Sequence, residues 1–286
     1  MLGRRGTLPF LAGPPALWLA LFFVVPLLLI AAFSFRAGSG LVGPSAAWVP
    51  SVEHYQQVFG TPAFLRLLGL SVLTATGIAT FATLLAYPVA YFLTFRAGHR
   101  ATLYLTLLLI PFAVSYLLRV MAWKLMLGPD GGINSLLQGI GLTDGPLELL
   151  LYSRPAVIVT LVYVWVPFAA LPIYAAMQRI DRSHLEAAAD LGAGPWARFW
   201  RVTVPLSLPG ALATFFMVFI PTVGEYVTPA LVGGTDGIMY GNIILGFFTR
   251  SANWPLGSAM AMVMLVLTLL LVVVALRVVD LRRVSL

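Results

Sequence analysis

The chain of 286 residues contains no cysteine, which excludes disulfide bonds and thiolate metal sites. Charge is also scarce, since Asp, Glu, Lys and Arg together make up 9% of the residues, whereas soluble domains carry about 25%. A chain with 60% hydrophobic residues and so little charge cannot cover itself with a polar surface. We therefore expect a protein that is largely surrounded by lipid.

Six apolar runs approach the length of about 20 residues that a helix needs to cross a bilayer. They cover residues 16–34, 68–95, 101–118, 155–178, 207–232 and 256–276. The third runs into Arg119 and Lys124, and the fifth is interrupted by Pro221 and Gly224. The alternation over about ten residues that is typical of a membrane barrel is missing. The sequence therefore predicts an all-α membrane protein with six transmembrane helices and a single domain over residues 1–286.

Positive charge is distributed unevenly between the two sides that these runs define. One side collects eleven Lys and Arg residues and four acids, and the other side collects six of each. Because cytoplasmic loops retain Lys and Arg, we expect both chain termini in the cytoplasm. The net charge of +7 then lies on the cytoplasmic side, so it reflects membrane topology and predicts no binding of nucleic acid.

The sequence lacks the groups that would let this chain supply its own energy or chemistry. A phosphate-binding G-x-x-x-x-G-K-[ST] loop is excluded, because the only lysine, Lys124, follows Met-Ala-Trp. The three histidines, His54, His99 and His184, fall in predicted loops, and Glu225 is the only carboxylate inside an apolar run. A stand-alone secondary transporter or channel would need coupling groups within its spans and an internal repeat. A membrane enzyme would need a cluster of His, Asp or Glu, which is also missing.

One extended polar interval, residues 179–206, separates the fourth and fifth runs on the positively charged side. Ser183 followed by Glu186 matches a capping box, so we expect a helix to begin near His184. Gly192 is expected to end that helix in the left-handed conformation.

A second short helix is expected to follow in the same interval. Pro195 suits its first turn, and Pro205 and Pro209 are expected to end it before the fifth run. The alanine-rich first helix allows close approach of another protein. The alternative is that the alanines only favour helix and that the aromatic residues of the second helix hold it at the membrane interface.

The interval carries a spaced motif. Glu186-Ala187-Ala188 is followed after three residues by Gly192, and after nine more by Val202-Thr203-Val204-Pro205. This pattern resembles the EAA loop of binding-protein-dependent ABC importer permeases at every spacing. Four further runs resemble the B-type subunit of the spermidine/putrescine permeases: PFAVSYLLRVMAWKLML (111–127), GGINSLL (131–137), VPFAALPIY (166–174) and NWPLGSA (253–259). Asn253 stands where that group commonly has an aspartate.

The resemblance, which covers residues 65–276, implies a type I ABC importer permease fold in a bacterial inner membrane. It implies that this chain forms half of a pore with a second homologous permease subunit, that a cytoplasmic ABC ATPase dimer binds the EAA loops, and that an extracytoplasmic substrate-binding protein docks outside. ATP and Mg would be bound by the ATPase, so no cofactor, metal or catalytic residue is expected here. The implied substrate is a polyamine, putrescine or spermidine, and the alternatives are another amine, an opine or ferric ion.

Contact with the ATPase is assigned by the same resemblance to the first helix of the interval and its C-terminal turn. The residues are Ser183, Leu185, Glu186, Ala187, Ala188, Asp190, Leu191, Gly192 and Ala193.

A substrate path is expected near the external end of the fifth run. Glu225, beside Tyr226, can contact an ammonium group through charge and cation–π attraction. The alternatives are an ion pair with Arg119 or Lys124, or exposure at the membrane interface. The further residues expected on this path are Tyr116, Arg119, Trp123 and Trp165. For the aromatic ones, the alternative is packing or an interfacial belt.

Overall fold

The computed structural model describes residues 8–39 and 49–278, with side chains from residue 13 onward. The basic residues Arg4, Arg5, Arg282 and Arg283, on which the expected orientation of the termini partly rests, lie outside the described residues. The contacts divide the chain into two compact units, residues 1–66 with 243–267 and residues 67–242 with 268–286. The single domain over residues 1–286 stays a prediction. In the described part of the chain all regular secondary structure is helical, apart from one isolated β-bridge between Arg36 and Pro50.

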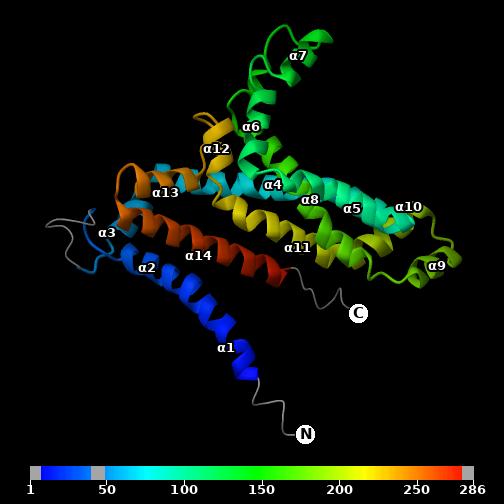
Figure 1. Ribbon diagram of the computed structural model, residues 1–286, viewed down its shortest axis with the longest axis horizontal. Coiled ribbons are helices and arrows are strands. Elements are labelled where there is room, and N and C mark those ends of the chain that lie inside the picture. Colours follow the sequence, from blue (N-terminus) through cyan, green and yellow to red (C-terminus); the bar gives the residue numbers. More distant parts are fainter. Residues whose placement is uncertain (1–7, 40–48, 279–286) are drawn as a thin grey trace. The chain divides into compact units, whose positions relative to one another are not determined.

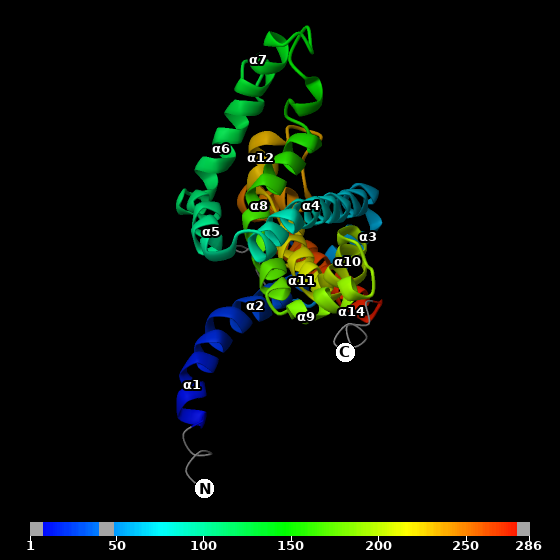
Figure 2. The ribbon, with the colours of Figure 1, turned by 90° about the vertical axis from the view of Figure 1, so that its right-hand side faces the viewer.

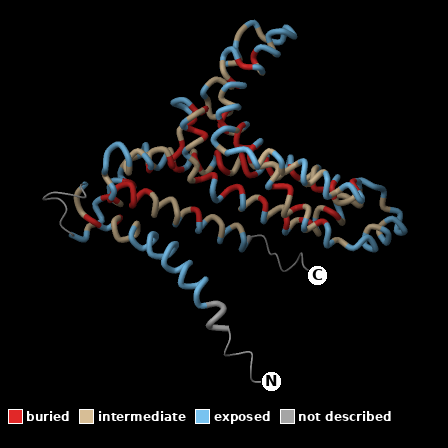
Figure 3. The backbone as a smooth tube through the Cα atoms, in the orientation of Figure 1, coloured by how far each residue is buried: buried red, intermediate tan, exposed pale blue. Residues whose placement is uncertain are grey.

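The first unit begins with an apolar helix. Helix α1 (Leu8–Leu19), a π-helical turn (Ala20–Val24) and α2 (Val25–Ser34) follow one another without a break. The stretch from Gly13 to Ser34 is long and apolar enough to cross a membrane, and its most apolar window contains no buried residue, as the pale blue tube in Figure 3 shows. The expected first span is therefore confirmed as a helix, and its surface is left for lipid or a partner to cover.

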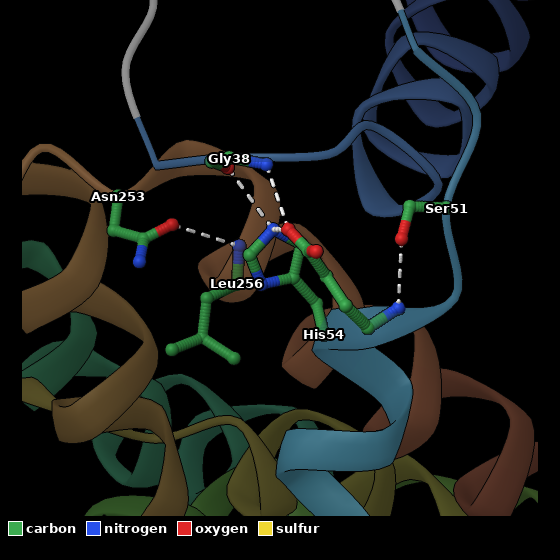
Figure 4. Close-up of polar contacts among 6 residues, drawn as sticks. Gly38, Ser51, His54, Asn253 and Leu256 are labelled. Carbon is green, nitrogen blue, oxygen red and sulfur yellow. Dashed lines mark hydrogen bonds and ion pairs between the residues drawn. The ribbon is translucent and has the colours of Figure 1, made fainter. Parts of the chain in front are cut away.

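Helix α3 (Glu53–Gly60) and the loops around it complete this unit together with most of α13 (Tyr240–Thr249) and the part of α14 (Trp254–Val278) up to residue 267. The Nε2 atom of His54 lies 3.0 Å from the carbonyl oxygen of Gly38, and the backbone N–H of Leu256 donates to Oδ1 of Asn253 at 3.2 Å (Figure 4). Asn253 thus caps the start of α14, which is a role that asparagine and aspartate fill equally well.

The second unit is built on α4 (Pro62–Phe95), α8 (Arg154–Met177) and α11 (Val204–Val223). Small side chains allow these helices to pack closely. Alanines recur along the buried face of α4 at residues 75, 79, 82, 86 and 90, at the three- and four-residue spacing of one helix face. Gly210 of α11 lies against Ala176 and the Pro172 carbonyl of α8, where a Cβ atom would come within 2.4 Å and 2.7 Å of them.

The third apolar run is broken, so the expected helix over 101–118 is wrong in shape. Helix α5 (Ala101–Leu109) passes into a 3₁₀ turn (Ile110–Ala113), and α6 (Tyr116–Leu127) restarts at an angle, the two helical stretches being bent by 85°. Pro111 lacks the N–H that would continue the α-helix. Helix α6 leads to α7 (Gly132–Gly139), which lies away from α4 and α11 in both views (Figures 1 and 2).

The fifth run also differs from its prediction at both ends. A continuous helix extends from Pro195 to Val223 through α10 (Pro195–Arg198), a π-helical turn (Phe199–Thr203) and α11. Pro205 and Pro209 therefore do not end a separate surface helix. At the other end the helix stops at Val223, as Pro221 and Gly224 predict, and α12 (Val227–Val232) is a separate short helix. Within residues 8–39 and 49–278, five helices are long and apolar enough to span a membrane, or six if the bent pair is counted as one span.

Candidate functional site

The polar interval between α8 and α11 folds around α9 (Arg182–Asp190). The backbone N–H of Ser183 donates to the carboxylate of Asp181 at 3.0 Å, so Asp181 is the N-cap and the helix begins at Arg182. This hydrogen bond holds the pKa of the Asp181 carboxyl below its usual value. The predicted capping box is wrong, because Ser183 lies inside the helix. Among the described residues, Glu186 makes no side-chain hydrogen bond and no ion pair, and it is exposed.

The end of α9 confirms the prediction for Gly192. Its φ angle is +81°, its N–H donates to the Ala189 carbonyl at 2.8 Å, and the Ala193 N–H donates to the Ala188 carbonyl at 2.9 Å. These two bonds form a Schellman motif, which fixes the direction of the chain as it leaves a helix. The turn leaves Leu191 with 90% of its surface exposed.

The residues predicted to contact an ATPase are thus brought together on one compact turn and helix. Helix α9 packs against α10 and the π-helical turn that follows, and α9 and α10 lie at one end of α8 and α11 (Figure 1). Leu185 and Ala188 are half-buried, whereas Glu186, Ala187 and Leu191 are exposed. Ser183, Asp190 and Gly192 are also exposed, and Ala193 is half-buried. The outward surface of α9 and its C-terminal turn therefore carries small side chains, the two exposed carboxylates Glu186 and Asp190, and the exposed Leu191.

The aromatic residues of the next helix divide between two surroundings. Phe199 packs edge-on against Tyr87 and Tyr91 of α4, with ring centroids 5.8 Å and 5.5 Å apart. Trp196 and Trp200 are 73% and 52% exposed. Phe199 therefore belongs to the packing between helices, while the side chains of Trp196 and Trp200 face outward.

Three residues predicted for the substrate path line one cavity. Tyr116, Arg119 and Trp165 surround a space of about 440 Å³ between the bend after α5 and helix α8. The Arg119 guanidinium lies 4.6 Å from the centroid of the Phe112 ring. Nε of Arg119 and Nε1 of Trp165 are buried and have no hydrogen-bond partner within the described residues. The lining of this cavity therefore includes two N–H donors without a partner in the described chain.

Trp123 does not join these residues. It lies beside Tyr163, with ring centroids 5.2 Å apart, and lines a separate, almost wholly apolar cavity of about 750 Å³ between α4, α5, α6 and α8. Trp123 therefore borders a different cavity from Tyr116, and its place on the substrate path stays a prediction.

Glu225 lies in the turn between α11 and α12. Its Oε1 atom accepts the backbone N–H groups of Val227 at 2.8 Å and Thr228 at 3.2 Å, which are the first two residues of α12. It forms neither of the ion pairs considered above within the described part of the chain. The neighbouring Tyr226 is 44% exposed.

Two residues of this region escape the sequence reasoning. The Thr228 hydroxyl lies 2.6 Å from the Tyr116 hydroxyl, and the Asn242 side chain donates to the Tyr226 carbonyl at 2.7 Å. The sequence Glu-x-x-Thr-Pro at 225–229 could have pointed to Thr228. A proline in the first turn of a helix has no N–H, so a carboxylate that caps the helix can bind only the N–H groups that precede the proline.

Comparison with known proteins adds to this geometry. The chain is 37% identical over 253 residues to the spermidine/putrescine transport system permease protein PotB of Haemophilus influenzae, covering 87% of this chain and 86% of that one. It is 35% identical over 246 residues to PotB of Escherichia coli, covering 85% and 86%. A bacterial alginate ABC transporter, solved in complex with an alginate pentasaccharide-bound periplasmic protein, contains a chain with a TM-score of 0.71 at 19% identity, covering 95% and 93%.

The structural likeness shows the fold alone, which is that of a type I ABC importer permease. The family profile of the binding-protein-dependent transport system inner membrane component matches residues 86–284, which include the whole interval around α9 and the turn at Glu225. The chain therefore belongs to the family of inner membrane components of binding-protein-dependent transport systems.

Proposed function

We propose that this chain is a permease subunit of an ATP-driven ABC importer for spermidine and putrescine. It forms half of the pore with a second homologous permease subunit, and a substrate-binding protein delivers the solute from outside. Both termini face the cytoplasm of a bacterial inner membrane. The substrate class is supported by the names of relatives that match about 85% of this chain.

The observation that carries the proposal is the outward surface of α9. Glu186, Ala187 and Leu191 are exposed on a helix whose two ends are fixed by Asp181 and by the turn at Gly192. A carboxylate without a partner in its own chain is available to one in another protein. An ATPase dimer that binds ATP and Mg contacts this surface, so this chain needs no nucleotide site.

The solute passes the turn that contains Glu225. One carboxylate oxygen of Glu225 accepts two N–H groups of α12, and the charge of the carboxylate attracts an ammonium group. The second candidate solute is an opine, which carries carboxylates as well as amines. It is favoured by the unpartnered N–H groups of Arg119 and Trp165 in the adjacent cavity.

The test of the ATPase contact is the variant Glu186→Ala in the assembled complex. Because Glu186 has no partner within the described chain, we expect thermal unfolding of the permease to stay unchanged while the amount of co-purified ATPase falls several-fold. The matched control is Glu148→Ala, which changes an exposed glutamate on another loop and should leave ATPase binding intact. Full ATPase binding by Glu186→Ala would contradict the proposed contact.

A further inference from the structure

Two helices in the second unit are interrupted, and the two interruptions are joined. The first interruption lies between the 3₁₀ turn that ends at Ala113 and the start of α6 at Tyr116. The second lies between the end of α11 at Val223 and the start of α12 at Val227. An interrupted helix can change direction at the break without losing the hydrogen bonds on either side.

The joint is a hydrogen bond between the first turns of the two restarted helices. Tyr116 is the first residue of α6 and Thr228 is the second residue of α12, and their hydroxyl groups lie 2.6 Å apart. Thr228 is fully buried, and α6 packs against α12. Removing either hydroxyl leaves the other one without this partner, which is costly for a buried polar group.

The start of α12 is otherwise satisfied by its own turn. Glu225 accepts the N–H groups of Val227 and Thr228, and the next residue, Pro229, has no N–H to satisfy. Thr228 therefore bonds to the turn through its backbone and to α6 through its side chain, so it connects the two elements.

The two interruptions differ in the space around them. The turn at Gly224 and Glu225 is packed against Gly241, which belongs to the same unit, since a Cβ atom on Gly241 would lie 2.5 Å and 2.9 Å from their carbonyl oxygens. Asn242 also holds the Tyr226 carbonyl at 2.7 Å. The interruption before Tyr116, in contrast, borders the cavity of about 440 Å³. A movement of the packed turn at Gly224 and Glu225 can therefore be passed to α6, because the cavity beside Tyr116 leaves α6 room to move.

We propose that the Tyr116–Thr228 hydrogen bond makes α6 and α12 change position together during transport. Tyr116 and Thr228 are then positioning residues that couple the two interrupted helices. The inference rests on the proposed function, because it assigns these residues a part in the import cycle.

The test is a double-mutant cycle in the complete reconstituted complex, with Tyr116→Phe and Thr228→Val, which remove the hydroxyls and nearly keep the shapes. Each single variant should lower the solute imported per ATP hydrolysed by about five-fold, which corresponds to roughly 1 kcal/mol, the size of a typical hydrogen bond. The double variant should be no worse than either single variant.

The matched control is Tyr87→Phe. Tyr87 shares a hydrogen bond of 2.6 Å with Ser207, but it connects α4 and α11 within uninterrupted stretches, so its loss should leave the ratio of import to ATP hydrolysis unchanged. Effects of Tyr116→Phe and Thr228→Val that multiply in the double variant would overturn the coupling. The coupling would also be overturned if Tyr116→Phe and Thr228→Val lowered the import per ATP hydrolysed no more than Tyr87→Phe does.

A second measurement separates this inference from the proposed function. The chain has no cysteine, so spin labels can be placed at Met121 of α6 and Ala230 of α12, which are both exposed. We expect a narrow distance distribution in the complex that Tyr116→Phe broadens. If the wild-type complex imports no polyamine but the distribution still broadens, the proposed function fails and the coupling stands. An unchanged distribution contradicts the coupling whatever the solute is.

Discussion

Glu225 has a structural role and a proposed functional role that substitutions can separate. Glutamine keeps a carbonyl oxygen that can accept the N–H groups of Val227 and Thr228, whereas alanine leaves both without a partner. Only the carboxylate can attract an ammonium group by its charge. The difference between the two variants therefore isolates the charge from the cap.

We expect Glu225→Gln to raise the KM for spermidine about five-fold, equivalent to about 1 kcal/mol, and to leave thermal unfolding unchanged. Glu225→Ala should also lower the free energy of unfolding by about 1 kcal/mol, as the loss of a helix cap does. Uptake kinetics and thermal unfolding of the same complexes measure both effects. An unchanged KM and rate for Glu225→Gln would remove Glu225 from the cation path.

At the residue level the sequence predicts Gly192 but misplaces the start of α9. Few residues other than glycine adopt the left-handed conformation at the end of a helix. The position of Gly192 after the alanines therefore predicts where α9 ends. Asp181 and Ser183 have nearly equal preference for the N-cap. The choice between them depends on how the chain leaves α8, where Arg179 and Ile180 form the connecting turn, and local sequence does not specify that direction.

Among the elements, α8 and α11 owe their close packing to one glycine. A Cβ atom at position 210 would meet Ala176 and Pro172 of α8 at distances that require a shift of the helices. A Cβ atom at Gly77 of α4 would have no neighbour within 4 Å. Alanine at position 77 therefore changes only the helix propensity.

We expect Gly210→Ala to lower the free energy of unfolding by about 1–3 kcal/mol, as overpacking does. Gly77→Ala should raise it by about 0.5–1 kcal/mol, since glycine inside a helix is unfavourable relative to alanine. Thermal unfolding of the purified complex measures both. Equal stability of the two variants would show that α8 and α11 separate at no cost.

The helices themselves were mostly predictable, because runs of apolar residues are specified by composition. Their interruptions were less so. Pro221 followed by Gly224 correctly predicts a break, but Pro205 lies in a helix that continues, since the preceding π-helical turn, with its Val204 N–H bonded to the Phe199 carbonyl, widens the helix before the proline. The bend before Tyr116 lies in a run without glycine, where only Pro111 marks it and packing decides its angle.

For the whole molecule, the surface of the first helical stretch carries the main implication. Its most apolar window has no buried residue, and the helix is apolar all round, so lipid or a second membrane protein must cover it. The exposed apolar surface can show that this helix needs such a cover. The solute is less readable from the sequence, because in the function proposed here a separate binding protein also selects it.

We propose that this chain imports polyamines through ATP hydrolysis by a partner. The most direct measurement is uptake of labelled spermidine by proteoliposomes that contain this permease, its second permease subunit and the ATPase, with the binding protein outside. We predict accumulation that requires ATP on the ATPase side and that putrescine reduces by competition. Accumulation driven by an ion gradient without ATP, or import of an opine and not of spermidine, would contradict the account.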